Sequence, residues 1–385
     1  MKILLYHWES YYEQDIQSIL REEGVSFEII RWKFQDKNHD DTFLSYVKKN
    51  VSLNQFDCLF SINYWPLLSE ICQQAGIPYL CWCYDNPLNV RDIQRTLGNE
   101  TNHVYCFDKT QVLGYQRQGF QTVSHLPLGI NRKRLSKVSP YDPHCLRFAS
   151  DVSFVGKLYE SAMDQIMAAT DDYCKGYLQA LINAQSEVYG AYLIDQSITD
   201  TFLDKINQSF RERMPGTGFV LHREELSFAL ACEVTRRDRI ILLSLIGPRA
   251  KTKFYSYNGS SVIKGVEKCP PVDYLEEMPY VFAASRINLN PSLRAIQSGI
   301  PLRALDIMAC GGFLLSNYQE ELAKAFVHES EMVLYESLPD ALEKALYYLK
   351  HEGERAKIAL KGREKTLADY DMRDRLTLMF KTLAE

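Results

Sequence analysis

The segment Arg286–Asn317 constrains the fold of this chain most, because it has the pattern of strand, loop, helix, glycine turn and strand. Ile287–Asn290 is short and apolar, like a buried parallel strand, and Pro301 lies in the first turn of the helix, where proline is favoured. A Gly-Gly pair ends that helix before a second strand begins at Phe313–Leu315. Free N–H groups and the helix dipole gather at such a helix start. The segment therefore predicts an α/β domain with an anion site.

Arg303 and Asp306 give this helix a telling charge pattern. Arg303 lies in the first turn, where the helix dipole disfavours a cation, so the arginine requires an anionic partner. Asp306, three residues further on, is one candidate, and a bound phosphate is the other. With phosphate as the partner, Asp306 could accept hydrogen bonds from ribose hydroxyls. The spacing alone leaves both an ordinary packing helix and a nucleotide site open.

Short apolar runs alternate with amphipathic runs over the first ~130 residues, which is the βαβ pattern of a doubly wound sheet. The six expected strands are Ile3–His7, Phe27–Trp32, Cys58–Ile62, Tyr79–Tyr84, Val104–Phe107 and Thr122–Pro127. The pattern predicts one Rossmann-like domain over residues 1–135. Pro140 and Pro143 interrupt it, so residues 136–150 are expected to form a linker.

A second α/β domain is expected over residues 151–365, beginning with a strand at Asp151–Gly156. Residues 160–236 show helical periodicity without convincing strands, which predicts a helical insertion. Glu354–Phe380 has the pattern of a long amphipathic helix. The other expected strands of this domain are Arg239–Leu243, Lys253–Tyr257, Ser261–Lys264, Ile287–Asn290, Phe313–Ser316 and Met332–Tyr335.

Length, charge and cysteine placement exclude several classes of protein. A chain of 385 residues is long for one domain and comfortable for two. The net charge of −5 argues against a nucleic-acid partner, because nucleic-acid-binding domains are usually basic. No apolar run approaches the roughly 20 residues that span a membrane, and the start of the chain lacks the apolar core of a signal peptide. The ten cysteines form no Cys-x-x-Cys pair, which predicts buried thiols in a reducing cytoplasm.

The run GIPLRALDIMACGGFLLSNYQEEL, Gly299–Leu322, resembles the signature of the CgeB-like glycosyltransferases, a bacterial branch of the GT-B class related to glycosyl transferases group 1. The resemblance extends to Asp151–Tyr159, Tyr79–Leu88 and His125–Asn131. It implies an α/β GT-B fold, in which two Rossmann-like domains face a cleft, here with the helical insertion in the second domain. In such proteins a C-terminal helix crosses back to the first domain, a role expected of residues 366–385.

The resemblance also implies an activity, of the hexosyltransferase type. Such an enzyme moves a sugar from a nucleoside-diphosphate donor, here a UDP-sugar, to a hydroxyl group of a glycan, a glycoprotein or an envelope acceptor. We expect no metal and no other cofactor, because helix N-termini and basic side chains neutralise the leaving diphosphate in this class. A GT-B-fold nucleotide-sugar epimerase and a non-catalytic nucleotide-sugar-binding relative remain as alternatives, and oligomer formation is left open.

Donor-binding residues are expected where strands of the second domain end. Lys157 follows a strand, where a lysine can reach a diphosphate, and a solvated loop lysine is the alternative. Small residues around Ser298 let backbone amides approach a pyrophosphate closely. Val272 and Tyr274 would flank the nucleobase or pack in the core. The predicted donor site comprises Gly156, Lys157, Val272, Tyr274, Ser298, Gly299, Ile300, Arg303 and Asp306.

Catalytic residues are harder to assign. Many retaining GT-B enzymes carry two glutamates separated by seven residues, and here Ser298 and Asp306 hold those positions. The first acid is therefore missing, which leaves retention or inversion open. In the first domain, Asp85 could act as general base on an acceptor hydroxyl or bond a turn, and Glu9 lies where inverting relatives carry a base. The expected acceptor or cleft residues are His7, Asn63, Asn86 and Gly129.

Overall fold

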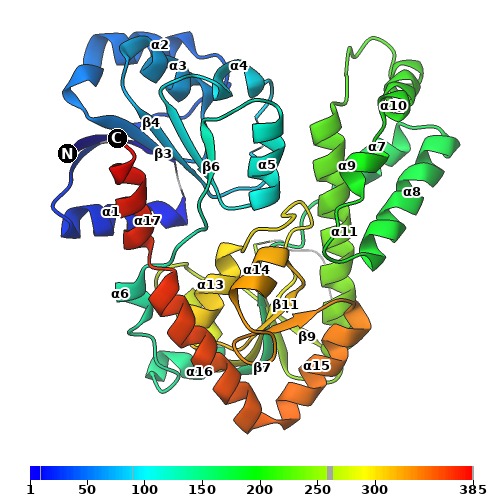
Figure 1. The fold of residues 1–385 in the computed structure, drawn as a ribbon. Coiled ribbons are helices and arrows are strands. Elements are labelled where there is room, and N and C mark those ends of the chain that lie inside the picture. The colour runs from blue at the N-terminus through cyan, green and yellow to red at the C-terminus, as the bar shows by residue number, and fades with distance from the viewer. Residues whose placement is uncertain (9, 89, 258–262, 384–385) are drawn as a thin grey trace. The chain divides into compact units, whose positions relative to one another are not determined.

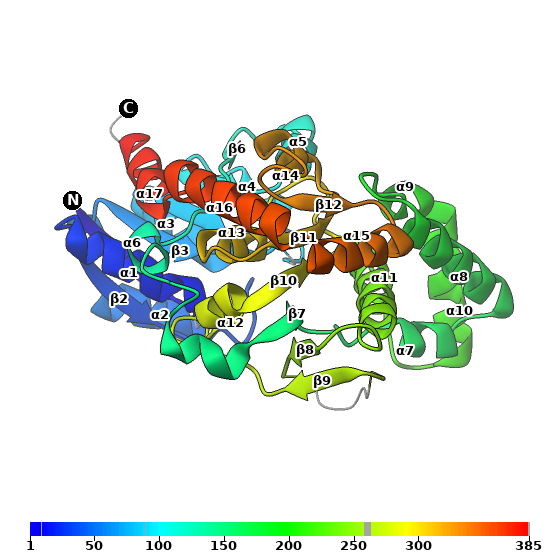
Figure 2. The same ribbon diagram turned by 90° about the horizontal axis from the view of Figure 1, so that it is seen from below.

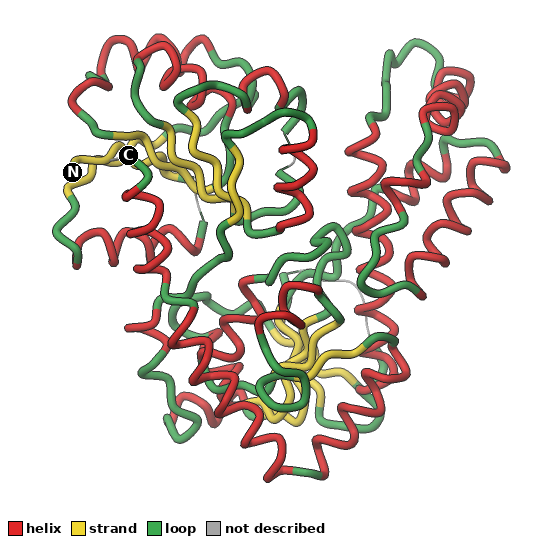
Figure 3. Tube along the Cα trace, viewed as in Figure 1, coloured by secondary structure: helices red, strands yellow, loops and turns green. Residues whose placement is uncertain are grey.

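The computed structural model of the chain describes residues 1–8, 10–88, 90–257 and 263–383 (Figure 1). The chain forms two compact units. Unit 1 consists of Met1–Lys133 with Asp369–Glu385, and unit 2 consists of Arg134–Ala368. Each unit holds one six-stranded parallel sheet, drawn in yellow in Figure 3, with helices packed around it. The predicted α/β class is confirmed.

The sheet of unit 1 has the strand order β2-β1-β3-β4-β5-β6. Every residue of β3 and β4 is buried, as expected for central strands of a sheet that is covered on both faces. Figure 1 shows α2 and α3 on one face and α1 and α17 on the other. The strands are β1 Lys2–His7, β2 Ser26–Arg31, β3 Cys58–Ile62, β4 Tyr79–Cys83, β5 Asn102–Cys106 and β6 Val123–His125. The helices are α1 Tyr11–Glu22, α2 Asp41–Asn50, α3 Pro66–Ala75, α4 Gln94–Leu97, α5 Lys109–Arg117 and α17 Met372–Lys381.

Side-chain caps set where three of these helices begin. Ser10, Asp40 and Asp108 each accept a hydrogen bond from a backbone N–H in the first turn of α1, α2 and α5, respectively. In a doubly wound sheet such helix starts follow strand ends, so they lie toward the carboxyl edge of the strands. The polar side chains that cap these three helices therefore lie toward that edge of the sheet.

The sheet of unit 2 has the order β12-β11-β10-β7-β8-β9. Its core includes the rings of Phe154 and Phe254, which stack with centres 5.4 Å apart on neighbouring strands. The strands are β7 Ser150–Val155, β8 Thr252–Tyr255, β9 Val266–Cys269, β10 Ser285–Asn290, β11 Leu314–Asn317 and β12 Val333–Tyr335. The helices packed with them are α12 Met278–Ala284, α13 Leu302–Ala309, α14 Glu320–Ala325, α15 Leu338–Lys350 and α16 Glu352–Asp369.

A group of helices extends unit 2 to one side of its sheet, as Figure 2 shows. These helices have an apolar core of their own, which includes Leu178, Ile206 and Leu230. The longest of them, α11, also packs against the sheet through Leu242 and Ile246. Their bounds are α7 Met163–Ala168, α8 Asp172–Glu187, α9 Ile194–Ser197, α10 Asp200–Arg213 and α11 Arg223–Ile246.

Three expectations about secondary structure are wrong. Arg239–Leu243 is part of α11 and not a strand, because a short apolar run has the same pattern in a buried strand and in a buried helix. The strand expected at Ser261–Lys264 lies later in the chain, as β9, and the first two of those residues fall outside the described part. The helix expected at Glu354–Phe380 is divided into α16 and α17, because Asp371 leaves the helix and caps α17.

Candidate functional site

The loop from β10 to α13, together with α13 itself, carries five of the nine predicted donor residues. β10 ends at Asn290, and α13 begins at Leu302, directly after Pro301 with φ −63° and ψ 138°. Gly311, with φ +78°, follows the helix and turns the chain into β11. The predicted order of strand, loop, helix and strand is confirmed. The loop lies at the carboxyl edge of a parallel sheet, where open α/β sheets bind ligands.

Ser298 is held by a glutamate that the sequence pattern did not indicate. The Oγ of Ser298 donates to Oε1 of Glu321 at 2.8 Å, and the N–H of Glu321 donates to the carbonyl oxygen of Ser298 at 2.9 Å. Ser298 is 3% exposed, and Glu321 is half-buried in the first turn of α14. Folding therefore brings a carboxylate to the position where the sequence lacks an acid. The signal in the sequence was weak, because acidic residues are common in first helical turns for reasons of stability alone.

Tyr274 and Asp306 lie together inside unit 2. The hydroxyl of Tyr274 donates to Oδ1 of Asp306 at 3.2 Å, and the two residues are 6% and 4% exposed. The guanidinium group of Arg134 stands 5.2 Å from the centre of the Tyr274 ring, and all three residues line one crevice that is too narrow to admit a water molecule. The structure thus joins two residues for which separate roles, at the base and at the ribose, are expected.

Arg303 lies against α12. Its guanidinium group contacts Sδ of Met278 and stands 5.5 Å from the centre of the Phe282 ring. Such contacts are individually weak, so they do not account for a cation in the first turn of a helix. A phosphate partner for Arg303 stays a prediction. Gly299, Ile300 and Val272, three further predicted donor residues, are buried.

The loops after β7 and β10 are tied together from α11 by Arg239. Its guanidinium group donates twice to the carbonyl oxygen of Pro291, at 3.0 and 2.7 Å, and once to that of Lys157. Arg239 is 7% exposed and lies 4.8 Å from the centre of the Tyr159 ring. The side chain of Lys157 is exposed, and Gly156 precedes it at the end of β7. The two predicted donor loops therefore share one buried anchor.

A second anchor holds the β10–α13 loop at Arg294, three residues after Pro291. Arg294 donates to Oδ2 of Asp238 from Nε at 2.9 Å, and its NH2 stands 2.7 Å from the same oxygen. The backbone N–H of Arg294 donates to Oγ1 of Thr235 at 2.9 Å. Asp238 and Thr235 both belong to α11, so that helix fixes the course of this loop.

In unit 1, His7 at the end of β1 pairs with a buried carboxylate. Nδ1 of His7 lies 2.7 Å from Oε1 of Glu13, which is 2% exposed. Glu13 also accepts from Nε2 of Gln17 at 2.7 Å and from the N–H of Trp8 at 3.2 Å. An ionised carboxylate only accepts hydrogen bonds, so the pairing of an ionised Glu13 with a neutral His7 ring requires the tautomer in which Nδ1 carries the proton and Nε2 is the basic nitrogen. A histidine oriented by a carboxylate in this way can act as a general base.

Asn63, Asp85 and Asn86, three predicted acceptor or catalytic residues, lie where β3 and β4 end. Nδ2 of Asn63 donates to Oδ2 of Asp85 at 2.7 Å. Oδ1 of Asn63 accepts from the N–H groups of Tyr84 and Asp85 at 2.8 and 2.9 Å. Asn63 has φ +59°, a conformation that asparagine tolerates better than most residues. The hydrogen bonding in a turn that was the alternative for Asp85 is therefore present.

Gly129 is closely packed within unit 1. Its N–H and carbonyl oxygen both hydrogen bond to the hydroxyl of Tyr12, at 3.0 and 2.7 Å. A Cβ at this position would stand 2.8 Å from Cα of Met372, so only glycine fits. These contacts give Gly129 a packing role. Glu9, the other predicted base, lies outside the described residues.

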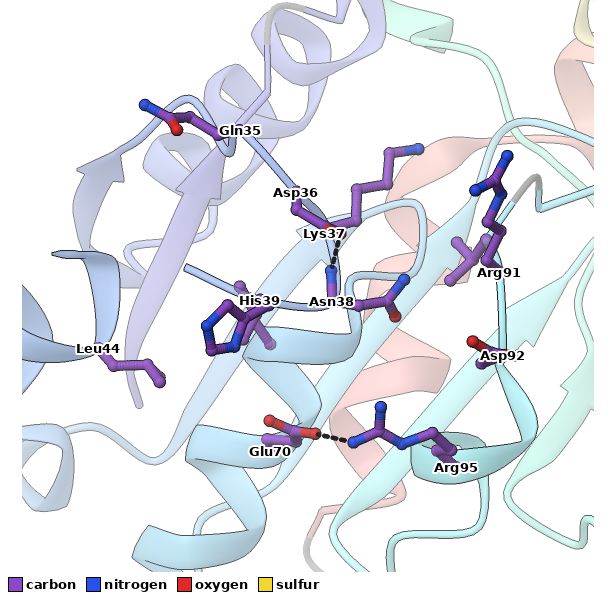
Figure 4. A pocket seen from close by; sticks show the side chains of 12 residues that line it. Gln35, Asp36, Lys37, Asn38, His39, Leu44, Glu70, Arg91, Asp92 and Arg95 are labelled. Carbon is purple, nitrogen blue, oxygen red and sulfur yellow. Dashed lines mark hydrogen bonds and ion pairs between the residues drawn. The ribbon is translucent and has the colours of Figure 1, made fainter. Parts of the chain in front are cut away.

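Unit 1 also contains an open groove with a volume of about 760 Å³, within the size range of ligand sites (Figure 4). Four segments line it: the loop Gln35–His39 after β2, Leu44 of α2, residues of α3 that include Glu70, and residues within Val90–Arg95 after β4. Glu70 stands 4.0 Å from Arg95, and Nζ of Lys37 lies 5.1 Å from the Trp65 ring. The lining mixes cationic, anionic and apolar side chains. Sequence reasoning missed this groove because none of its segments carries a motif.

The described part of the chain offers neither a metal site of clustered ligands nor a membrane-spanning helix. Within the described ranges, no group of three or more His, Cys, Asp or Glu residues is placed to hold a metal ion. No helix in the same ranges is both long enough and apolar enough to cross a membrane. All ten cysteines are buried with free thiols.

The architecture of the two units is that of the GT-B glycosyltransferase fold, which three solved structures share at full length. Sucrose-phosphate synthase from Thermosynechococcus elongatus is 12% identical with a TM-score of 0.58, covering 100% of this chain and 99% of its own. Anabaena Alr3699/HepE in complex with UDP and glucose is 12% identical with a TM-score of 0.54, covering 100% of both chains. A glycosyltransferase from Rickettsia africae is 8% identical with a TM-score of 0.51, covering 99% of this chain and 97% of its own.

The sequence adds a separate line of comparison. Residues 223–381, which run from α11 to α17, match the model of a family described as glycosyl transferase-like. No curated protein matches the chain.

Proposed function

We propose that the chain is a glycosyltransferase that moves a hexosyl group from a UDP-sugar to a hydroxyl group of a glycan, glycoprotein or envelope acceptor, without a metal ion or another cofactor. The observation that carries the proposal is the match of residues 223–381 to the glycosyl transferase-like family, because this span includes the loop and helix start at the carboxyl edge of the unit 2 sheet. The HepE structures are complexes with UDP or UDP-glucose, which supports UDP as the nucleotide.

The donor is assigned to unit 2. Backbone N–H groups of residues 298–300 and 302 receive the diphosphate, and Lys157 and Arg303 add positive charge. Asp306 and Tyr274, which share a hydrogen bond, serve the ribose and the base. The buried anchors from α11 support this assignment, because preorganised loops lose less entropy when a ligand binds.

The acceptor is assigned to unit 1, to the groove and to the polar groups at the strand ends. The His7–Glu13 pair is the best-formed base there, ahead of Asp85, because Glu13 fixes the ring through Nδ1. Nε2 of His7 takes the proton of the acceptor hydroxyl group. At the same time, the oxygen of that hydroxyl group forms a bond to the anomeric carbon of the donor sugar. The bond from that carbon to the diphosphate oxygen breaks, and UDP leaves with the electron pair. A retaining reaction would not require this base.

A thermal-denaturation screen against nucleotide-sugars tests the proposal. A ligand at about 100 times its Kd adds roughly 2.7 kcal/mol of apparent stability. The sugar that stabilises the protein is then offered with a panel of glycans, and release of UDP is expected with and without EDTA. Absence of stabilisation by every nucleotide-sugar would overturn the proposal. Consumption of the donor without an acceptor would indicate an epimerase, and donor binding without UDP release would indicate a non-catalytic binder.

A further inference from the structure

The segment Asn317–Glu321 is joined to the loop before α13 at more than one point. Beside the two bonds between Ser298 and Glu321, Nε2 of Gln319 donates to the carbonyl oxygen of Ile296 at 3.2 Å. Nearer the strands, Oδ1 of Asn317 accepts from the N–H of Ser292 at 2.7 Å. The loop is therefore fastened along its length to the segment that follows β11. A side chain carried by such a rigid support keeps its position without a ligand.

The strands beneath this segment fix its distance from the loop. β10 and β11 are parallel neighbours, with Asn290 opposite Ser316. Nδ2 of Asn290 donates to Oγ of Ser316 at 3.0 Å, and Oγ of Ser316 donates to the carbonyl oxygen of Asn290 at the same distance. Glu321 therefore stands at the carboxyl edge of two adjacent strands, beside the loop assigned to the diphosphate.

The chemistry of a carboxylate limits what Glu321 can bind there. A negative charge repels phosphate, so Glu321 is unsuited to the diphosphate itself. A carboxylate can accept about four hydrogen bonds, so it can serve several hydroxyl donors at once. The hydroxyl-rich, uncharged part of a UDP-sugar is the sugar. Because Glu321 is half-buried, hydrogen bonds to its charge are less screened than on an open surface.

We propose that Glu321 binds hydroxyl groups of the donor sugar and that Ser298 positions it for this task. The proposal rests on the proposed function and deepens it, since it places the residue that distinguishes one sugar from another on α14. The competing explanation is that Glu321 only anchors the loop. Glu321→Gln separates the two, because glutamine still accepts the hydrogen bond from Ser298 but lacks the charge.

The experiment compares the wild type, Glu321→Gln and a matched control, Glu320→Gln. Glu320 is the neighbouring residue of α14, is exposed, and pairs with Lys324 one turn on. Calorimetry measures the Kd of the UDP-sugar found in the screen and the Kd of UDP alone. Glu321→Gln is expected to weaken UDP-sugar binding about tenfold, a loss of ~1.4 kcal/mol, and to leave UDP binding within about twofold. Glu320→Gln is expected to change neither.

A charge relocation provides the positive test. The double variant S298E/E321S exchanges the two residues, so the carboxylate is carried at position 298 instead of position 321. It is expected to regain part of the UDP-sugar affinity that Glu321→Gln loses. If Glu321→Gln is poorly folded, Ser298→Ala replaces it in the test. This variant keeps the charge of Glu321 but removes the hydrogen bond from Oγ of Ser298, so it should show a smaller loss of UDP-sugar affinity.

Three results would overturn the proposal. UDP-sugar binding by Glu321→Gln equal to that of the wild type would leave Glu321 as a loop anchor, with the glycosyltransferase function intact. An equal loss for UDP and UDP-sugar would mean that the loop is distorted. If the wild type binds no UDP-sugar, the proposed function fails, and this inference fails with it.

Discussion

The guanidinium group of Arg239 and the carbonyl oxygen of Pro291 are joined by two hydrogen bonds, of 3.0 and 2.7 Å, inside unit 2. Arg239 comes from α11, whereas Pro291 begins the loop to α13. Because the same guanidinium group also donates to the carbonyl oxygen of Lys157, one side chain fixes two loops at the carboxyl edge of the sheet. The helices beside the sheet thus support the predicted donor site.

Replacing Arg239 with alanine is expected to destabilise the protein by ~3 kcal/mol or more. The change leaves one buried and one partly buried carbonyl oxygen without their charged donor, and hydrogen bonds to charged groups are worth about 1.5–3 kcal/mol each. Urea denaturation measures the loss, and UDP binding should weaken in parallel. Arg249→Ala, an exposed arginine just after α11, serves as control and should stay near the wild type. A stable Arg239→Ala variant with normal UDP affinity would contradict the anchoring role.

Replacing His7 with alanine tests the base. If Nε2 of His7 accepts the proton of the acceptor hydroxyl, kcat should fall about 10²–10⁴-fold, the usual worth of general acid–base catalysis. The KM for the donor should hardly change. Glu13→Gln should lower kcat less, because the ring remains but loses its orienting charge. Activity of His7→Ala close to that of the wild type would exclude the base and favour a retaining reaction or Asp85.

Arg95→Ala tests the groove of unit 1. Arg95 lines the groove opposite Glu70, so its removal changes the charges that a polar acceptor would meet. We expect the KM for the acceptor to rise about tenfold, equivalent to ~1.4 kcal/mol, with the KM for the donor unchanged. Arg117→Ala, exposed on α5, is the control. An unchanged acceptor KM would place the acceptor elsewhere.

Two glycines of α16 make a matched pair for stability. A Cβ on Gly362 would stand 2.2 Å from the carbonyl oxygen of Glu331, whereas a Cβ on Gly353 meets no atom within 4 Å. Gly362→Ala should therefore cost about 1–3 kcal/mol of unfolding free energy through overpacking. Gly353→Ala should be neutral or slightly stabilising, because alanine favours the helix. Thermal melts of both variants provide the comparison, and equal effects would refute the close packing of α16.

His103 on β5 is expected to make the protein less stable in mild acid. Burial lowers the pKa of His103 below its ordinary 6.5, so the unfolded chain binds the proton more readily than the folded one. Stability should therefore fall as the pH drops below about 6.5 toward the folded pKa. Urea melts at pH 7.5 and 5.5 should show a smaller difference for His103→Gln than for the wild type. A larger difference in the variant would reverse the sign of this argument.

Secondary-structure elements that depend on neighbouring residues could be predicted from the sequence. Contacts between residues that are distant in the sequence form only on folding and could not be predicted. Pro301 and the Gly-Gly pair after α13 act locally, so the strand–helix–strand segment could be located. Glu321 lies 23 residues from Ser298, and the residues next to each of them in the sequence do not indicate that the two are in contact. The apolar neighbours of Arg239 fit a buried strand as well as a buried helix, so the sequence pattern predicts a strand where the structure has α11. With the wrong element, the anchoring role of Arg239 cannot be predicted. The groove joins four separate segments, which only the folded sheet and its helices bring together.

The return of Asp369–Glu385 to unit 1 bears on the order in which the chain folds during synthesis. Ile130 exchanges backbone hydrogen bonds with Tyr370 and Met372, at 2.8 and 2.9 Å, and Tyr105 bonds Thr382 at 2.7 Å. Unit 1 therefore leaves the ribosome first yet is completed last, after all of unit 2 has been translated. Until then the surface that receives α17 is bare and open to chaperones or to misassociation. Loss of the segment that carries α17 would thus damage unit 1, although most of unit 1 is translated before unit 2.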